Sequence, residues 1–202
     1  MTEASRSRPL EAHSLNEVRY YLTVTVCPSC GKGPREIDHA DGPDPQTRLA
    51  VVTAGCRHCL QRDTLEFVCG HDVPAEGPQA ETINPDIAPS RIIDLAQWLS
   101  LFYLLVESAA SDTSSLDTRR GGFQAALCLA EALKFYGDDE LPPRSAFFSE
   151  ATGEMFRQHP QKFARERLRD MQAKLPALAV MARQVARDER SVRQPWWRFW
   201  RR

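Results

Sequence analysis

The sequence lacks the long apolar runs by which membrane-spanning and secreted chains are recognised. Its most apolar stretch, LAQWLSLFYLLV at residues 95–106, has 12 residues, whereas a membrane-spanning helix needs about 20. The opening residues MTEASRSRPLEAHS contain no apolar h-region, so we expect no secretory signal and a cytoplasmic protein. The apolar stretch is instead expected to form a helix buried inside a domain.

The sequence also lacks the short motifs that carry a known catalytic mechanism. It has no G-x-S-x-G, no P-loop, no H-E-x-x-H and no dinucleotide-binding fingerprint. Its 5 histidines are scattered through expected loops and provide no obvious general base. We therefore predict a protein that is not an enzyme and that has no evident small-molecule substrate.

Composition and charge are those of a globular protein with an unusual division of charge. In 202 residues, 42% are hydrophobic and 26% are charged, which is typical of a soluble domain. Residues 1–156 contain 13 Lys and Arg against 23 Asp and Glu, whereas residues 157–202 contain 13 against 4. An acidic body with a basic C-terminal arm is thus expected. Such an arm either contacts nucleic acid, anionic lipid or an acidic partner, or packs on the acidic surface of its own chain.

The first 89 residues show strand patterns between loops. Residues 1–18 are polar and are expected to be a flexible N-terminus. Apolar and polar residues alternate, or β-branched and aromatic residues gather, in three segments that we predict to be strands: 21–26, 47–54 and 64–69. Prolines at positions 74, 78, 85 and 89 then predict an extended linker over residues 71–89.

From residue 90 onward the apolar residues recur with helical spacing, and we predict a helical domain over residues 90–191. The expected helices cover residues 90–110, 115–136, 149–158, 160–175 and 177–190. Large apolar side chains on their inner faces should form the core of this domain. These are Trp98, Leu99, Phe102, Leu105, Phe123, Leu127 and Leu133.

Four of the six cysteines form two C-x-x-C pairs. Cys27 and Cys30 lie in CPSCGK, and Cys56 and Cys59 follow after a spacer of 25 residues. A redox-active pair needs its second cysteine inside a helix, but Cys30 is followed by Gly-Lys-Gly-Pro. The double pair instead matches the tetrahedral ligand set of one structural Zn²⁺, which leaves no open coordination position.

The residues around the pairs also suit a metal site. Gly31 can adopt the backbone conformation that a tight turn around an ion requires. Lys32, Arg57 and Arg62 are placed to offset the charge of −2 that four thiolates and Zn²⁺ would carry. Other possible ligands are interpreted as secondary: His58 and His71 lack a place in a complete four-cysteine site, and Cys69 and Cys128 are expected in the core.

The order strand, CPSCG, strand, GCRHC, strand resembles a zinc ribbon over residues 19–70. The resemblance implies a small three-stranded β module with one zinc ion held by Cys27, Cys30, Cys56 and Cys59. With the helical remainder, the fold class is expected to be α+β in two parts, a β zinc ribbon followed by an all-α domain. Ribbons occur in transcription factors, ribosomal proteins, polymerase subunits and adaptors, so the resemblance implies zinc but no single function.

The chain ends in RQPWWRFWRR, a basic aromatic tail over residues 192–202. Arginine and tryptophan together suit nucleic acid, the interface of an anionic membrane or the groove of a protein partner. Alternatively the tail folds back on its own domain. We interpret the chain as a protein-interaction or scaffolding module, with nucleic-acid binding and peripheral membrane attachment as alternatives. The candidate partner-binding residues are Arg183, Arg187, Arg190, Trp196, Trp197, Arg198, Phe199 and Trp200.

Overall fold

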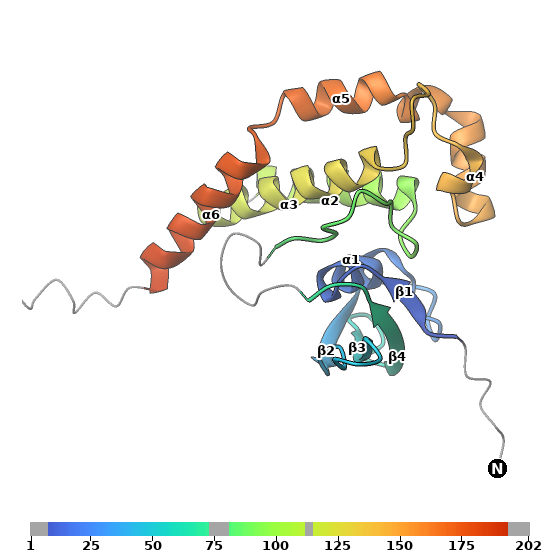
Figure 1. Cartoon of the computed structure of the whole chain (residues 1–202), viewed down its shortest axis with the longest axis vertical. Coiled ribbons are helices and arrows are strands. Elements are labelled where there is room, and N and C mark those ends of the chain that lie inside the picture. The colour runs from blue at the N-terminus through green and yellow to red at the C-terminus, as the bar shows by residue number, and fades with distance from the viewer. Residues whose placement is uncertain (1–7, 73–80, 112–114, 194–202) are drawn as a thin grey trace, which may run out of the picture.

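The computed structural model describes residues 8–72, 81–111 and 115–193 (Figure 1). Within these residues the chain forms one four-stranded sheet and six α-helices, so the fold is mixed α and β. Figure 1 shows the sheet at one end of the molecule and α2 to α6 at the other, with α1 between them. None of the helices in these described stretches is both long and apolar enough to cross a bilayer.

The sheet is built from a three-stranded antiparallel unit and one added strand. Strands β2 (Arg35–Ala40), β3 (Leu49–Cys56) and β4 (Arg62–Cys69) pair antiparallel, and β1 (Leu10–Ala12) pairs parallel with β4. The strand order is β1-β4-β3-β2. Every second residue of β3 is buried, because successive side chains of a strand point to opposite faces.

The strand predicted over residues 21–26 is wrong, because most of these residues lie in helix α1 (Leu15–Val24). Ser14 caps the helix by accepting a hydrogen bond from the backbone N–H of Glu17. Val18 and Leu22, four residues apart, are fully buried on one face. Six alternating residues were too few to distinguish a strand from the end of a helix.

The N-terminal segment contributes to the fold well before residue 19. Residues 10–18, expected to be flexible, form β1 and the first turn of α1, and Val18 is completely buried. The parallel strand β1 and the strand β2 therefore replace the segment 21–26 in the sheet. The two other predicted strands, over residues 47–54 and 64–69, correspond to β3 and β4.

Five further α-helices follow, close to their predicted positions. They are α2 (Leu95–Ser111), α3 (Ser115–Leu133), α4 (Glu150–Gln158), α5 (Arg165–Ala173) and α6 (Leu178–Arg193), with short 3₁₀ turns at Arg144–Ala146 and Pro160–Phe163. The helix predicted from residue 160 begins instead at Arg165. Pro160 opens only a 3₁₀ turn, and the backbone N–H of Arg165 is bonded to the carbonyl of Glu140.

Most buried side chains of the sheet and of the helices form one continuous cluster, and Phe123 and Ala126 of α3 form a second, smaller one with Met181 and Val185 of α6. Leu22 of α1 and Phe67 of β4 belong to the same cluster as Trp98 of α2 and Leu129 of α3. The Tyr20 ring lies 5.8 Å from that of Trp98, centroid to centroid. Of the predicted core residues, Trp98, Leu99, Phe102 and Phe123 are buried. The other three, Leu105, Leu127 and Leu133, are half-buried.

The described part of the proline-rich segment, residues 81–89, packs between α1 and α3. Ile83 is 1% exposed, and its carbonyl accepts a hydrogen bond from the hydroxyl of Ser14. The side chain of Asn84 donates to the carbonyl of Ala88 and to Glu131 of α3. This segment thus connects the sheet and the helical layer by direct contacts as well as by the chain itself.

Candidate metal centre

The four cysteines of the two pairs meet at one end of the sheet. Their Sγ atoms all lie within 4.8 Å of one another. The Sγ atoms of Cys27 and Cys59 are 3.7 Å apart, as are those of Cys30 and Cys56. Four sulfurs bonded tetrahedrally to one ion at about 2.3 Å would be separated by about 3.8 Å. The four cysteines are therefore positioned to hold one metal ion.

Cys27 and Cys30 lie on a tight turn between α1 and β2, which we call the first knuckle (residues 27–32). Two backbone hydrogen bonds close it. The N–H of Gly31 donates to the carbonyl of Cys27 over 2.8 Å. The N–H of Cys27 donates to the carbonyl of Lys32 over 2.7 Å. Gly31 has a φ of +67°, which confirms the permissive conformation predicted for it.

Cys56 and Cys59 lie on a second knuckle (residues 56–61) between β3 and β4, and it repeats the first. The N–H of Leu60 donates to the carbonyl of Cys56, and the N–H of Cys56 donates to that of Gln61, each over 2.9 Å. Leu60 occupies the position of Gly31 and has a φ of +61°. This conformation costs a non-glycine residue about 1–2 kcal/mol. Nothing in the sequence pattern indicated this strain.

All six cysteines lie in the described residues, and none of them is in a disulfide. Cys69 and Cys128 are fully buried, as predicted, and are not part of the four-sulfur cluster. Burial raises the pKa of the Cys69 thiol to about 11. It raises the pKa of Cys128 still further. Both thiols therefore stay neutral at pH 7 and act as small apolar core residues.

The pKa values of the clustered thiols diverge. At Cys27, burial acts to raise the pKa, but the backbone N–H groups of Ser29 and Cys30 and the adjacent thiols lower it to about 7. At Cys59 the N–H of Gln61 lowers the pKa, yet burial and the three neighbouring cysteines raise it to about 12. One thiolate thus forms easily, whereas ionising all four requires a cation at their centre.

Two of the three cations predicted to offset the thiolates pair with carboxylates instead. Arg57 forms an ion pair with Glu36 of β2 at 2.6 Å, and Arg62 pairs with Asp38 of the same strand at 2.5 Å. Asp38 also lies over Gly55, where a Cβ atom would approach its carboxylate to 2.9 Å. These ion pairs connect Arg57 of the second knuckle, and Arg62 at the start of β4, to β2.

Lys32 is the third predicted cation, and it reaches across to the second knuckle. Its Nζ lies 3.1 Å from Nε2 of His58. Within the described residues, no carboxylate forms an ion pair with Lys32. The backbone N–H of His58 points at the sulfur of Cys56 over 3.4 Å, as donors around metal-bound thiolates do. The His58 ring therefore faces Lys32 and is not one of the clustered ligands.

A buried arginine contacts the chain segments on both sides of the cysteine cluster. Arg35 is 5% exposed, and its guanidinium donates to Asp63 of β4 at 2.8 Å and to the hydroxyl of Thr25 at 2.7 Å. These contacts fix the end of α1 and the start of β4, the two segments that flank the knuckles. Sequence reasoning missed Arg35, because an arginine in a polar strand gives no sign of being buried.

The remaining predicted site residues lie elsewhere. His71 is bonded through Nε2 to Asp86 at 2.9 Å, and the same carboxylate oxygen accepts Nδ1 of His13 at 3.1 Å. Among the described residues only the four cysteines form a potential metal-binding group of three or more side chains. His71 therefore holds residues 81–89 against the sheet.

Arg183 and Arg187 are exposed on α6, which packs on α3 through Met181 and Val185. Arg190 lies in α6, but its side chain is outside the described residues. The aromatic and basic tail residues are outside them as well, and they are Trp196, Trp197, Arg198, Phe199 and Trp200.

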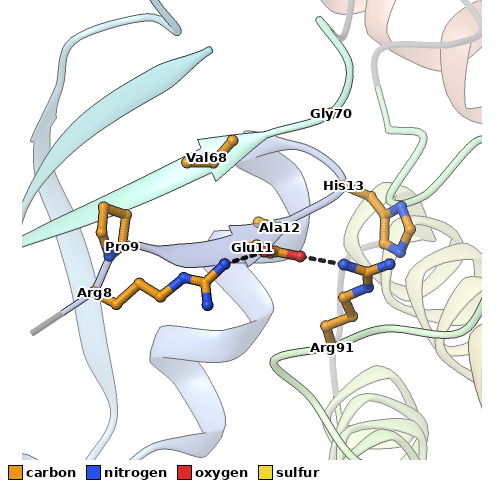
Figure 2. Close-up of a pocket in the computed structure, with 8 residues that line it drawn as sticks. All are labelled: Arg8, Pro9, Glu11, Ala12, His13, Val68, Gly70 and Arg91. Carbon is orange, nitrogen blue, oxygen red and sulfur yellow. Dashed lines mark hydrogen bonds and ion pairs between the residues drawn. The ribbon is translucent and has the colours of Figure 1, made fainter. Parts of the chain in front are cut away.

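A pocket of about 300 Å³ lies at the other end of β4 (Figure 2). Arg8 and Arg91 form its charged walls, and Figure 2 shows both guanidinium groups directed at the carboxylate of Glu11 between them. The three charged side chains of this pocket thus pair with one another. Its shape and charge give no reason to prefer it over the cysteine cluster as the functional site.

The chain was compared with protein-family models, with curated proteins and with solved structures, and none of the three comparisons found a match. The function must therefore be argued from the geometry of the cysteine cluster and its surroundings.

Proposed function

We propose that this chain is a non-enzymatic zinc-binding protein, in which a Cys₄ zinc ribbon over residues 19–70 stabilises a protein-interaction or scaffolding module. The observation that carries the proposal is the pair of matching knuckles, which bring four Sγ atoms within 4.8 Å of one another. The two turns have the same hydrogen bonds, and each directs two cysteines at one point, which packing alone does not require.

The four thiolates suit a thiophilic metal, and we propose that this metal is zinc. Four thiolates in tetrahedral spacing favour Zn²⁺ or iron over Ca²⁺ and Mg²⁺, which prefer oxygen ligands. Four protein ligands complete the coordination of Zn²⁺ and leave no position for water or substrate. The ion would thus hold the knuckles together without doing chemistry, which is the basis for proposing a structural role.

An interaction role follows from the position of the site. Cys59 is exposed, as are Arg57 and His58 beside it, so the second knuckle belongs to the surface of the molecule. A closed metal site would make this surface rigid, and a rigid surface loses little conformational entropy when a partner binds. The helical layer provides further exposed faces for the same or another partner.

Metal analysis of the full chain, purified without chelator, tests the proposal. We expect one zinc per chain, and we expect Co²⁺ substitution to give the visible absorption of a tetrahedral thiolate site. Cys56→Ser should remove the metal, whereas Cys69→Ala, which changes a cysteine outside the cluster, should retain one ion. A metal content near zero, or a Cys27–Cys30 disulfide under reducing conditions, would contradict the proposal.

Nucleic-acid binding is a second candidate function, favoured by the exposed Arg183 and Arg187 on α6. Binding through phosphate contacts would weaken steeply as salt rises. Replacing both arginines by glutamine should then reduce both the affinity for single-stranded DNA or RNA and the slope of its salt dependence. Binding that is absent, or that does not depend on salt, would favour the protein-interaction proposal.

Peripheral attachment to an anionic membrane is the third candidate, because the same arginines lead into the basic aromatic tail of residues 192–202. Sedimentation with phosphatidylserine vesicles would measure it. Attachment through the tail should be lost on removal of residues 194–202, and should be absent with neutral phosphatidylcholine vesicles.

A further inference from the structure

The 3.7 Å sulfur contacts of the cluster join cysteines of different knuckles. Cys27 of the first knuckle contacts Cys59 of the second. Cys30 of the first knuckle likewise contacts Cys56 of the second. The C-x-x-C spacing brings the cysteines of one pair together, whereas these contacts arise only from the fold. An S–S bond is about 2.05 Å long, so a shift of roughly 1.7 Å, shared between two side chains, would turn each contact into a disulfide.

Each contact also pairs a more accessible cysteine with a buried one. Cys59 is exposed and Cys30 is half-buried. Their contact partners, Cys27 and Cys56, are only 1% and 2% exposed. A dissolved oxidant therefore meets an accessible sulfur that has a second, resolving sulfur beside it, which is the arrangement of cysteines that oxidise reversibly. Binding to a metal keeps these sulfurs as thiolates, the form that reacts.

The choice of partners decides what oxidation would do to the fold. Disulfides within each C-x-x-C pair would close short loops and leave the two knuckles unconnected. Disulfides across the contacts would instead join residues 27–32 to residues 56–61, which is the connection that a bound ion makes. They would close loops of about 30 residues, and a disulfide stabilises a fold more when it closes a longer loop.

We propose that the cysteine cluster is an oxidation site, at which hydrogen peroxide exchanges the bound ion for two disulfides without opening the fold. The disulfides are Cys27–Cys59 and Cys30–Cys56. The thiolate of Cys59 attacks the peroxide, so that an S–O bond forms, the O–O bond breaks and hydroxide leaves. The thiolate of Cys27 then attacks the sulfur of this sulfenic acid, the S–S bond forms and a second hydroxide leaves. The two sulfurs lose two electrons, which the peroxide takes up.

The remaining contact reacts in the same way with a second molecule of peroxide, and the ion leaves because its thiolate ligands are gone. Cys69 and Cys128 take no part, since both are fully buried and lie outside the cluster. The inference rests on the proposed function, because only a metal-loaded cluster has an ion to release.

The test uses the full chain, purified with its metal, and hydrogen peroxide as the oxidant. Metal content is measured first and tests the proposed function alone. Peroxide is then added in steps, and zinc release is followed with a colorimetric chelator against a sample without peroxide. Remaining thiols are blocked with N-ethylmaleimide before digestion with trypsin. Arg57 lies between Cys56 and Cys59, so trypsin puts these two cysteines on separate peptides.

The tryptic peptides 49–57 and 58–62 report which sulfurs have paired. We expect both to be linked to peptide 20–32, which carries the first C-x-x-C pair, and fragmentation between its two cysteines identifies each bond. With less than one peroxide per chain, the link to 58–62 should form first, because Cys59 is the exposed sulfur. Full oxidation should release all of the zinc, and dithiothreitol with added zinc should restore the metal-bound chain.

The melting temperature tests whether the disulfides replace the ion. The oxidised, metal-free chain should melt at a higher temperature than the reduced chain from which a chelator has removed the metal. Cys69→Ala, which removes a thiol outside the cluster, should give the same disulfides and the same release of zinc.

Other patterns would overturn the inference. These are a link between peptides 49–57 and 58–62, disulfides to Cys69 or Cys128, disulfides between chains, and zinc and thiols that persist in peroxide. An oxidised chain that melts no higher than the reduced, metal-free chain would overturn it as well. If the purified chain contains zinc but shows one of these results, the proposed function survives and only the oxidation site is wrong. A chain without metal would refute the proposed function, and with it the exchange of ion for disulfides.

Discussion

Two of the polar clusters in the described part of the chain, the four cysteines and a pair of buried carboxylates, differ in what balances their charge. At the end of the sheet, four cysteines are close enough for one thiol to have a pKa near 7 while another is raised to about 12. At the junction of α1 and α3, two buried carboxylates meet a lysine and several hydrogen-bond donors. A metal ion would balance the first group, whereas protons and hydrogen bonds balance the second.

The junction is built from residues on three segments. Glu131 of α3 accepts hydrogen bonds from Lys134 at 2.8 Å and from Asn84 at 3.3 Å. Glu17 of α1 is fully buried and accepts the backbone N–H of His13. Burial raises the pKa of both carboxyl groups, that of Glu131 to about 7. We therefore expect the stability of the cysteine end of the molecule to respond to metal and that of the junction to respond to pH.

Removal of a metal ligand should have the largest effect. Structural zinc contributes about 10–16 kcal/mol in small zinc modules, as much as the whole stability of a typical domain. We therefore expect Cys56→Ser to unfold the knuckles. Because Phe67 and Trp98 share one core, the helical layer should also melt at a lower temperature. Hydrogen exchange of α2 and α3 measures this, with Cys69→Ala as the variant that keeps all four ligands. Unchanged protection in these helices would mean that the two layers fold independently.

The packing between the sheet and the helical layer can be disrupted without changing the cysteine cluster or the buried carboxylates. Trp98 is fully buried in α2, and its ring faces Tyr20 of α1. Trp98→Ala should lower the free energy of unfolding by about 3–5 kcal/mol, because it removes a large side chain and leaves a cavity. Urea denaturation of the metal-loaded chain measures the loss. Leu104→Ala, at a position of α2 that is 55% exposed, should change stability by less than about 0.5 kcal/mol.

The pH dependence of the junction has a definite sign. The folded-state pKa of Glu131, about 7, lies above its ordinary value of 4.5, so its proton favours the folded state. This contribution is complete below about pH 4.5 and is lost as the pH rises through 7. We expect Glu131→Gln to be neutral or destabilising at pH 5 and to stabilise by about 1–3 kcal/mol at pH 8. Urea titrations at both pH values measure the difference.

A control on α4 should respond in the opposite direction. The hydrogen bond from Arg157 lowers the pKa of Glu154, so its contribution to stability is lost as the pH falls. Glu154→Gln should therefore not stabilise the chain at pH 8. A Glu131→Gln variant that followed the parent at every pH would show that this carboxyl group is not strained by burial.

The sequence predicted the cysteine pairs and most secondary structure of this molecule better than the contacts between distant segments. Two C-x-x-C pairs identified all four cysteines of the cluster, because the spacing alone brings each pair together. Two strands and the positions of the later helices also followed from periodicity. The helix α1 was missed, because YLTVTV alternates like a strand and the capping Ser14 lay in a stretch read as flexible.

The features that could not be predicted depend on long-range contacts. Arg35 is buried only because Asp63, distant in sequence, accepts its hydrogen bond. The proline-rich residues 81–89 were expected to form an extended linker. Instead Ile83 is bonded to Ser14, the N-cap of α1, and Asn84 to Glu131 of α3. Proline density excludes a regular helix or strand, but it does not exclude packing. The strain at Leu60 likewise arises from a turn whose geometry is set by the cysteines.

The smallest predicted effect concerns the exposed ion pairs beside the cysteine cluster. Asp38 and Arg62 are paired at 2.5 Å, but their side chains are 37% and 72% exposed. Because water screens such pairs, Asp38→Asn should lower the stability of the metal-loaded chain by less than about 1 kcal/mol, and it should leave the metal stoichiometry at one. Added salt should reduce even this difference. A larger loss, or a loss of metal, would show that the carboxylate on β2 is needed to hold the second knuckle in place. A small loss would leave the ion as the dominant interaction at this end of the sheet.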